Sequence, residues 1–388
     1  MQTAANIYRN LKGDRTIWLI VLLLAMCSVL TVYSASGMLA YQNSGSTEMY
    51  LAKHFILLMI GLGIMYGASQ LNYTRYSKAA PLLLLLAVPL LLYTLFLGAE
   101  VNDARRWITV PVIGLTFQTS DFARIALIVF VARSISKKQD VIKDFKTAFV
   151  PIILPVILVC ALIAPANLST AVLLFVTCLL MMFVGRVDMK YIGLMFLMGI
   201  LVMGLLLFLG SFFPEFARVE TWISRINDFL NNSDGGYQIQ QAKIAIADGG
   251  WLGVGPGNSE QRNCLPYPYA DFIYAIICEE YGLFGGLAII ALYFWLFIRC
   301  AAIVTKCPKA FGALLAMGFC LNLVIQAFAN IAVSLHLVPV TGLTLPLVSM
   351  GGTSMLFTCI AFGMILSVSK YIEQATREAG TVEIKTME

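Results

Sequence analysis

The sequence predicts an all-α polytopic membrane protein with ten transmembrane helices, on three observations. Of its 388 residues, 60% are hydrophobic and only 12% are charged, about half the charged fraction of an average soluble domain. Apolar runs of spanning length recur from one end of the chain to the other. The basic residues gather in alternate connecting segments, which is typical of multi-pass proteins.

The ten predicted spans are apolar runs that approach or exceed the length needed to cross a bilayer. The first follows Arg9, Lys12 and Arg15 and is too long for a signal-peptide core, so it is read as an uncleaved helix. The spans cover approximately residues 17–36, 55–70, 81–98, 117–132, 149–164, 168–184, 191–213, 272–297, 311–334 and 351–368. An even number of spans places both termini on one side.

The orientation follows from the Lys and Arg residues. With the N-terminus inside, eighteen of the 26 lie in inner segments and seven in outer ones, as the positive-inside rule requires. Residues 1–16 and 371–388 are then cytoplasmic tails. Residues 211–270 form a large extracytoplasmic loop between spans 7 and 8. One membrane domain covers 1–388, without a soluble domain on either face.

Asp271 is the candidate for chemistry. It stands where the proline-broken loop LPYPYA gives way to the eighth apolar run, and so at the membrane surface. Glu279 and Glu280 lie roughly two turns further in. They point about 80° and about 180° away from Asp271 around the helix, so they are expected to be structural or cavity-lining partners of other helices.

The outer loop 99–117 holds Arg105, Arg106 and Trp107. Arginine is suited to bidentate contact with phosphate, although a snorkelling basic pair beside an interfacial aromatic is an alternative. With Asp271 at the same face, these cations would suit sugar transfer from a lipid diphosphate donor. They would stabilise the leaving diphosphate while the carboxylate accepts a proton from the attacking hydroxyl.

Three polar side chains follow that loop at a spacing of three residues. Gln118, Asp121 and Arg124 share one helical face. An acid and a base at this spacing inside a span either pair with each other or a neighbouring helix, or line a cavity.

Near the C-terminus, LVPVTGLTLPLVSMGGTS interrupts the helical pattern before the last span. Such irregular backbone is tolerated in a membrane only where protein or a water-filled cavity covers it. The amides around Gly351 and Gly352 open a helix and form a candidate anion cradle. Ser349 beside them is a further candidate substrate contact. Simple helix breaking is the alternative.

The glycine-rich stretch GGWLGVGPGNS resembles a nucleotide-binding fingerprint only superficially, because no strand precedes it. It follows a short amphipathic helix at 237–247, and we expect either a flexible turn or a loop that lets a ligand approach the backbone. No metal site is expected at His54 or His336, which lack neighbouring ligands. Only Cys264 of the nine cysteines lies in an outer segment, so no external disulfide is predicted.

Five stretches together carry a family resemblance: NDARRWI, FQTSDFARIAL, YQIQQAKIAIADGGWLGVGPGNS, LPYPYADFIYAIICEEYGLFGG and PVTGLTLPLVSMGGTS. In this order they resemble the SEDS family of bacterial membrane glycosyltransferases, which contains FtsW and RodA. The resemblance implies the SEDS fold, with ten spans and a large loop between the seventh and eighth. It also implies polymerisation of lipid II, the lipid-linked disaccharide precursor of peptidoglycan. GLTLPLVS is similar to the division branch, FtsW, and PVTG to the elongation branch, RodA; the division branch is favoured.

The family's essential aspartate corresponds to Asp271, and its Arg–Trp loop to Arg105, Arg106 and Trp107. The chain departs from the family pattern at several positions. Thr119 and Asp121 replace the usual proline and glutamate around Ser120, and Ala166-Asn167 replaces a Pro-Asp pair. The usual histidine near the catalytic acid is missing, so its role is either dispensable here or performed by Tyr269.

The predicted reaction is an inverting glycosyl transfer with Asp271 as general base. Arg105, Arg106 and Lys243 would neutralise the diphosphate, and Gln118, Ser349, Gly351 and Gly352 complete the predicted substrate site. No cofactor is required by these residues, and a divalent cation, Mg²⁺ or Mn²⁺, is left open.

Two rivals differ in class: a flippase for lipid II, which fits the buried charges, and a scaffold for a transpeptidase. The resemblance implies a class B penicillin-binding protein of the FtsI type and other divisome membrane proteins as partners. No nucleic acid is expected as a partner. The predicted location is the bacterial cytoplasmic (inner) membrane, with both termini cytoplasmic.

Overall fold

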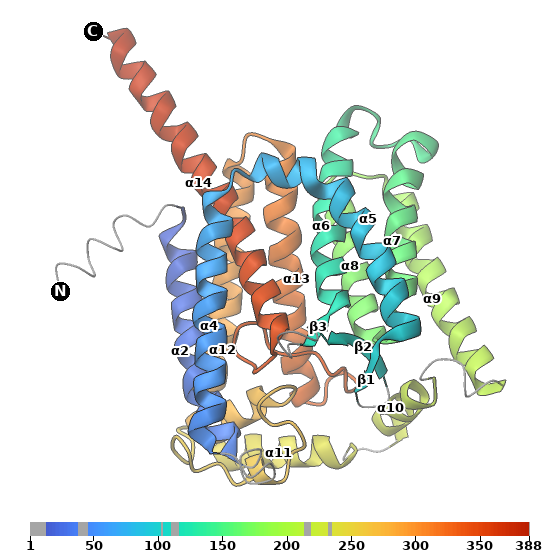
Figure 1. Cartoon of the computed structure of the whole chain (residues 1–388), viewed down its shortest axis with the longest axis vertical. Coiled ribbons are helices and arrows are strands. Elements are labelled where there is room, and N and C mark those ends of the chain that lie inside the picture. Colours follow the sequence, from blue (N-terminus) through green and yellow to red (C-terminus); the bar gives the residue numbers. More distant parts are fainter. Residues whose placement is uncertain are drawn as a thin grey trace.

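The computed structural model describes residues 13–37, 46–101, 104–109, 116–212, 219–231 and 235–387. Long helices lie side by side in a bundle, with a layer of shorter elements across one end (Figure 1). The helices are α2 (Arg15–Ala35), α4 (Thr47–Gln70), α5 (Tyr73–Leu97), α6 (Thr119–Lys137), α7 (Val150–Ile163), α8 (Leu168–Val184), α9 (Met189–Phe212), α10 (Val219–Asn231), α11 (Tyr237–Gly249), α12 (Ile273–Lys306), α13 (Ala310–Ser334) and α14 (Thr353–Met387).

Seven of the described helices are long and apolar enough to cross a membrane. They are α2, α4, α5, α7 with the π-helical turn before it, α12, α13 and the first part of α14. The apolar helix α8 and the charge-bearing α6 lie among them, and the apolar helix α9 lies at the edge of the bundle (Figure 1). The multi-pass helical prediction is therefore confirmed, and the count of ten spans stays a prediction.

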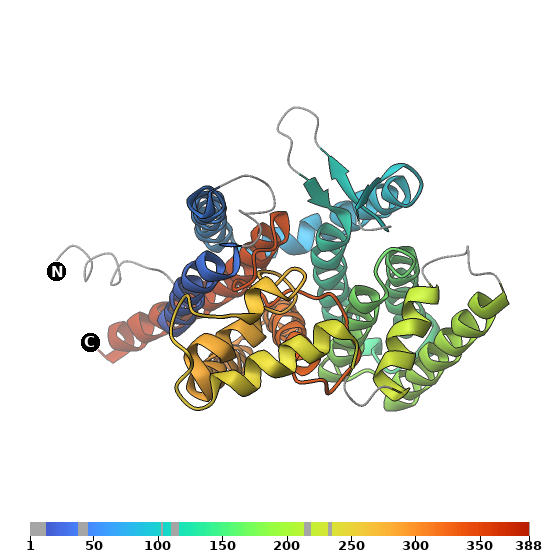
Figure 2. The same ribbon diagram turned by 90° about the horizontal axis from the view of Figure 1, so that it is seen from below.

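The first described residues and the C-terminal helix meet at one end of the bundle. The Gly13 amide donates to Glu373 Oε2 at 3.2 Å, and Asp14 both caps α2 and pairs with Arg299 near the end of α12. Helices α10 and α11 lie at the opposite end (Figure 1). Figure 2, which views that end, shows α11 lying across the bundle.

A small antiparallel sheet was not predicted from the sequence. Strands β1 (Ala99–Val101), β2 (Ala104–Thr109) and β3 (Thr116–Gln118) pair in that order. Trp107 stands opposite Gln118, and Ile108 opposite Phe117. The predicted span at 117–132 therefore begins as a strand, and its helix starts only at Thr119. The sheet fixes the Arg–Trp motif on paired backbone instead of a free loop.

Helix α12 is not one continuous span as predicted. Gly282 has φ 67° and ψ −165° and breaks the helix, and the Leu283 amide donates to the Gly250 carbonyl at 2.9 Å. The 24 residues after the break suffice to cross the hydrocarbon core at 1.5 Å each. Glu279 and Glu280 precede the break, in the short helical part of α12 that follows Asp271.

The glycine-rich loop packs on this break. A Cβ on Gly249 would meet the Cys278 carbonyl oxygen at 1.9 Å, and one on Gly253 the Glu280 carbonyl oxygen at 2.2 Å. The expectation that this loop admits a ligand to its backbone was therefore wrong for these glycines, because α12 itself makes the close approach.

Gly282→Ala should destabilise the protein. Its backbone conformation is essentially restricted to glycine and costs about 1–3 kcal/mol for other residues, and the new Cβ would meet the Trp251 carbonyl oxygen at 2.4 Å. Thermal unfolding of the purified protein measures the loss. Gly193→Ala in α9 is the control, because a Cβ there meets nothing within 4 Å. Equal unfolding temperatures for the two variants would contradict the assignment.

Candidate functional site

Asp271 lies in the turn just before α12, half-buried, with its backbone held from α13. The side-chain amide of Asn330 donates to the Asp271 carbonyl at 2.8 Å and to the Leu343 carbonyl at 2.7 Å. A Cβ on Gly342 would lie 3.8 Å from Asp271 Oδ2. One buried asparagine thus holds the carboxylate-bearing turn against the irregular segment before α14.

Ser349 joins the same two segments. Its hydroxyl donates to the Ala270 carbonyl at 2.6 Å and accepts from the Leu345 amide at 2.8 Å. The Met350 amide donates to the Tyr269 carbonyl at 2.9 Å. Ser349 is buried, and its hydroxyl holds the turn before Asp271 against the segment before α14.

The charged pair inside the bundle supports the same segment. Arg124 Nη2 lies 3.1 Å from Asp121 Oδ1, and Arg124 Nη1 donates to Gln326 Oε1 at 2.6 Å. Gln326 in turn donates to the Thr344 carbonyl at 2.9 Å. Asp121 and Arg124 were predicted either to pair or to line a cavity, and the structure shows the ion pair. Gln326 connects this pair to the backbone of the segment beside Asp271.

Further side chains bind the irregular backbone from other helices. Tyr293 of α12 donates to the Pro346 carbonyl at 2.5 Å, and Ser28 of α2 to the Val348 carbonyl at 2.8 Å. Three non-glycine residues here have positive φ, namely Tyr267, His336 and Leu347. Such conformations persist only where the surroundings over-determine them, and they cluster at functional sites.

Two arginines place positive charge around Asp271, one on each of two elements. Arg225 on α10 donates to the Val340 carbonyl at 3.0 Å, and Arg106 comes from β2. Burial raises the pKa of the Asp271 carboxyl, while the charges of Arg225 and then Arg106 oppose that rise. Arg225 was not among the predicted site residues. Its signal was the helical spacing of the apolar residues in 219–231, a segment that was read as part of a loop.

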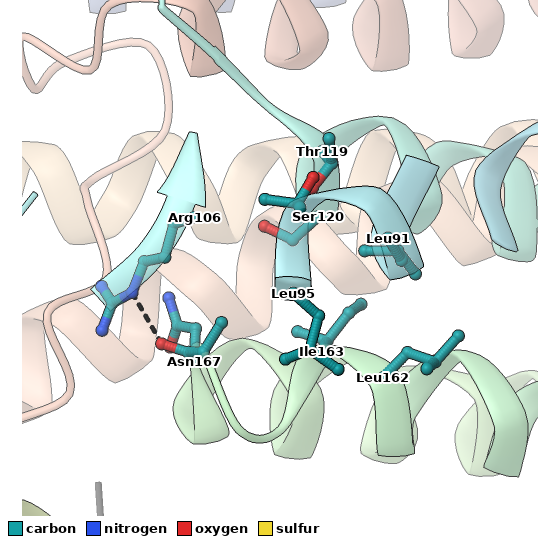
Figure 3. Close-up of a pocket in the computed structure, with 10 residues that line it drawn as sticks. Leu91, Leu95, Arg106, Thr119, Ser120, Leu162, Ile163 and Asn167 are labelled. Carbon is teal, nitrogen blue, oxygen red and sulfur yellow. Dashed lines mark hydrogen bonds between the residues drawn. The ribbon is translucent and has the colours of Figure 1, made fainter. Parts of the chain in front are cut away.

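Arg106 is anchored on the neighbouring turn between α7 and α8. Its Nε donates to the Ala166 carbonyl at 2.6 Å, and Figure 3 shows it beside Asn167, at the side of a cavity that Thr119 and Ser120 also line. The cavity of about 20 Å³ has room for roughly one water molecule. It is too small for a substrate group, so this turn serves to fix the arginine.

The remaining predicted residues lie on several other elements. Trp107 is half-buried, and Gln118, at the end of β3, donates to Ser120 at 2.9 Å. Gly351 and Gly352 precede α14, as predicted. Lys243 lies on α11, where its charge adds to burial in lowering the pKa of His336. The side chain of Arg105 lies outside the described part of the structure.

Glu279 and Glu280 bind the glycine-rich loop, so the expectation that they partner other helices was only partly right. Glu279 accepts from Ser259 and from the amides of Glu260 at 2.8 Å and Gln261 at 3.2 Å. Glu280 accepts from the Gly257 amide at 3.1 Å and from Ser34 of α2. These bonds fasten the loop to the part of α12 that precedes Gly282.

Among the described residues, no three His, Cys, Asp or Glu side chains form a group that could hold a metal ion. Mg²⁺ needs only one or two protein carboxylates where substrate phosphates supply further oxygens. Asp271 is thus a possible ligand only in combination with a diphosphate.

The sequence matches the model of the family described as "Cell cycle protein", covering FtsW, RodA and SpoVE, over residues 14–374. A Geobacter sulfurreducens relative named probable peptidoglycan glycosyltransferase FtsW is 32% identical, covering 97% of this chain and 100% of the relative. Stage V sporulation protein E of Bacillus subtilis is also 32% identical, covering 94% of this chain and 98% of its own.

Two solved structures share the fold. A chain of a peptidoglycan synthase complex superposes with a TM-score of 0.72 at 22% identity, covering 92% of this chain and 98% of that one. Thermus thermophilus RodA superposes with a TM-score of 0.67 at 22% identity, covering 93% of this chain and 98% of its own.

Asn330→Leu should lower the unfolding temperature of the protein, because it leaves two buried carbonyls without their donor at about 1–3 kcal/mol each. Asn322→Leu is a matched control on the same helix. Asn322 is also buried, and its Nδ2 has no hydrogen-bond partner among the described residues. Similar losses in both variants would show that the Asn330 bonds do not hold the turn.

Proposed function

The chain belongs to the FtsW/RodA/SpoVE family of cell cycle proteins, and from this premise we propose that it is a peptidoglycan glycosyltransferase that polymerises lipid II. Its relatives carry the name of that activity. The observation that carries the proposal is the fixed position of Asp271, whose turn is held by Asn330 and Ser349. The positive charges of two arginines act on its carboxyl.

Asp271 acts as the general base. It accepts the proton of the 4-hydroxyl on the acceptor's N-acetylglucosamine as that oxygen bonds to the anomeric carbon of the donor's N-acetylmuramic acid. The bond from that carbon to the undecaprenyl diphosphate breaks, and the diphosphate departs with the electron pair. A single carboxylate suffices because diphosphate is a good leaving group, unlike the leaving groups of glycosidases, which need two carboxylates.

Positive charge stabilises the departing diphosphate. Arg106, which donates to the Ala166 carbonyl, is the main candidate. After Arg225, its charge has the largest effect in lowering the pKa of Asp271, which burial raises. Arg105 and Lys243 are proposed to assist, and Gln118, Gly351 and Gly352 to contact the substrate. A bound Mg²⁺ or Mn²⁺ would supply further positive charge at the diphosphate.

We assign the protein to septal synthesis during cell division, with RodA-type elongation as the alternative. The support is the FtsW name carried by relatives that align over almost the whole chain. Its proposed partner is an FtsI-type class B penicillin-binding protein, beside other divisome proteins. Both termini are proposed to be cytoplasmic, which fits the contact of Gly13 with Glu373 at the end of the bundle opposite α11.

A flippase for lipid II is the rival function that the test must distinguish from a glycosyltransferase. In a transporter, the buried charges would line the pathway of the substrate and change partners during transport. In the structure, however, Asp121, Arg124 and Gln326 form a chain of bonds that ends on the backbone of the site. This arrangement favours a supporting role for those charges in an enzyme.

Asp271→Asn should lower the rate of glycan formation from labelled lipid II by about 10²-fold or more while leaving the unfolding temperature nearly unchanged. The substitution retains the size of the side chain and removes only its basicity. The assay compares wild type and variant, each alone and with a transpeptidase-inactive partner. Glycan from the variant at the wild-type rate would refute the base. Absence of glycan from both, with wild-type vesicles still moving lipid II between leaflets, would favour the flippase.

The pH profile of polymerisation tests the charges around the base. Asp271 must be ionised, so kcat/KM should rise with pH through its pKa, which burial has raised. Arg225→Gln removes an opposing charge, raises that pKa further and should move the acidic limb to higher pH. Arg225→Lys should shift it less, and Lys53→Gln on exposed α4 not at all. An unmoved limb in Arg225→Gln would contradict the coupling.

A further inference from the structure

A second cavity lies between α10, α11 and the segment that follows α13. Its volume is about 220 Å³, compared with about 20 Å³ for the cavity beside Arg106. This volume suits one sugar ring with its substituents. The lining residues are Arg225, Asp228, Phe229, Gly235, Gly236, Tyr237, Gln238, Ile239, His336, Pro339 and Val340.

The cavity adjoins Asp271 through two of its lining residues. Arg225 exerts its charge on the Asp271 carboxyl and donates to the carbonyl of Val340. Val340 lies two residues before Gly342, which faces Asp271 Oδ2. A group bound in this cavity would therefore sit on the α10 side of the base, while Arg106 approaches from the β-sheet.

The chemistry of the lining fits a neutral polyhydroxyl ring. Phe229 and Pro339 offer apolar surface, and Asp228, Gln238 and His336 offer hydrogen-bonding groups, a mixture typical of small-molecule sites. Phe229 and His336 pack edge to face with ring centroids 5.4 Å apart. The Asp228 carboxylate would repel a diphosphate, so the anionic part of a substrate belongs elsewhere.

The backbone around the cavity is shaped for this packing. His336 has φ 55°, unusual for a residue with a side chain. Gly235 has φ 78°, and a Cβ there would meet His336 Cε1 at 3.4 Å and Ile239 Cγ2 at 2.6 Å. A glycine that a side chain could not replace and a strained histidine from another segment thus meet at one wall of the cavity.

We infer that this cavity is the subsite for the acceptor's terminal N-acetylhexosamine, the sugar that bears the attacking hydroxyl. The inference rests on the proposed function for the identity of the sugar, but the binding itself does not require turnover. The acceptor's diphosphate is separated from this sugar by the second sugar of the disaccharide. The ring can therefore enter a cavity that contains a carboxylate.

The test uses free N-acetylglucosamine as the probe and the full-length protein in lipid nanodiscs, with binding followed by saturation-transfer NMR. Wild type and Asp271→Asn should both bind, because the base is not needed for binding. Asp228→Ala and Gln238→Ala should each weaken binding, the former about tenfold, as for loss of a hydrogen bond to a charged group. Asn227→Ala, exposed on the same helix, should bind as wild type does.

Kinetics supply a second measurement. In the lipid II assay, Gln238→Ala should raise KM with little change in kcat, as expected when binding is lost equally from ground and transition states. Unchanged probe binding in both cavity variants would overturn the subsite. Binding of the probe by a protein that makes no glycan would leave the subsite standing and count against the proposed enzyme instead.

Discussion

The whole site depends on satisfying the irregular backbone that lies between α13 and α14. Polar backbone without regular structure is costly near a membrane unless protein groups bind it. Here Asn330, Gln326, Ser349, Tyr293 and Ser28 each donate a hydrogen bond to a carbonyl of this segment or of the turn at Asp271. These donors come from α2, α12, α13 and the segment itself. Positioning of the carboxylate is therefore a property of the bundle, not of its own turn.

This constraint explains why charges remain inside and beside the bundle. Asp121 and Arg124 are expensive to bury, yet their pair ends on Gln326 and, through it, on the Thr344 carbonyl. Glu279 and Glu280 do the same for the glycine-rich loop, where they bind backbone amides and hydroxyls. Among the described residues, these buried polar groups hold backbone in place, whereas Asp271 is half-buried and lies within the influence of two arginines.

The fold class and the acid were predictable because hydropathy and position in the sequence determine them. Asp271 could be singled out as the carboxylate at the start of an apolar run, and the helical bundle from the apolar runs themselves. The sheet at 99–118 was missed because its strands are only three to six residues long. The break at Gly282 was hidden in a continuous apolar run. Arg225 was missed because α10 falls in a segment that was read as a loop, and because its bond to Val340 joins distant parts of the chain. Ser349 was predicted as a substrate contact, whereas its bonds to Ala270 and Leu345 are visible only in three dimensions.

If Asp271 removes the proton in the transition state, its loss must appear in the rate of the chemical step and not in substrate affinity. The most direct measurement is the lipid II concentration dependence of the residual activity of Asp271→Asn, with the unmodified protein alongside. A fall in kcat of about 10²-fold or more with KM nearly unchanged is the expected result for loss of a general base. A rise in KM with kcat preserved would show that Asp271 only binds substrate and that another group accepts the proton.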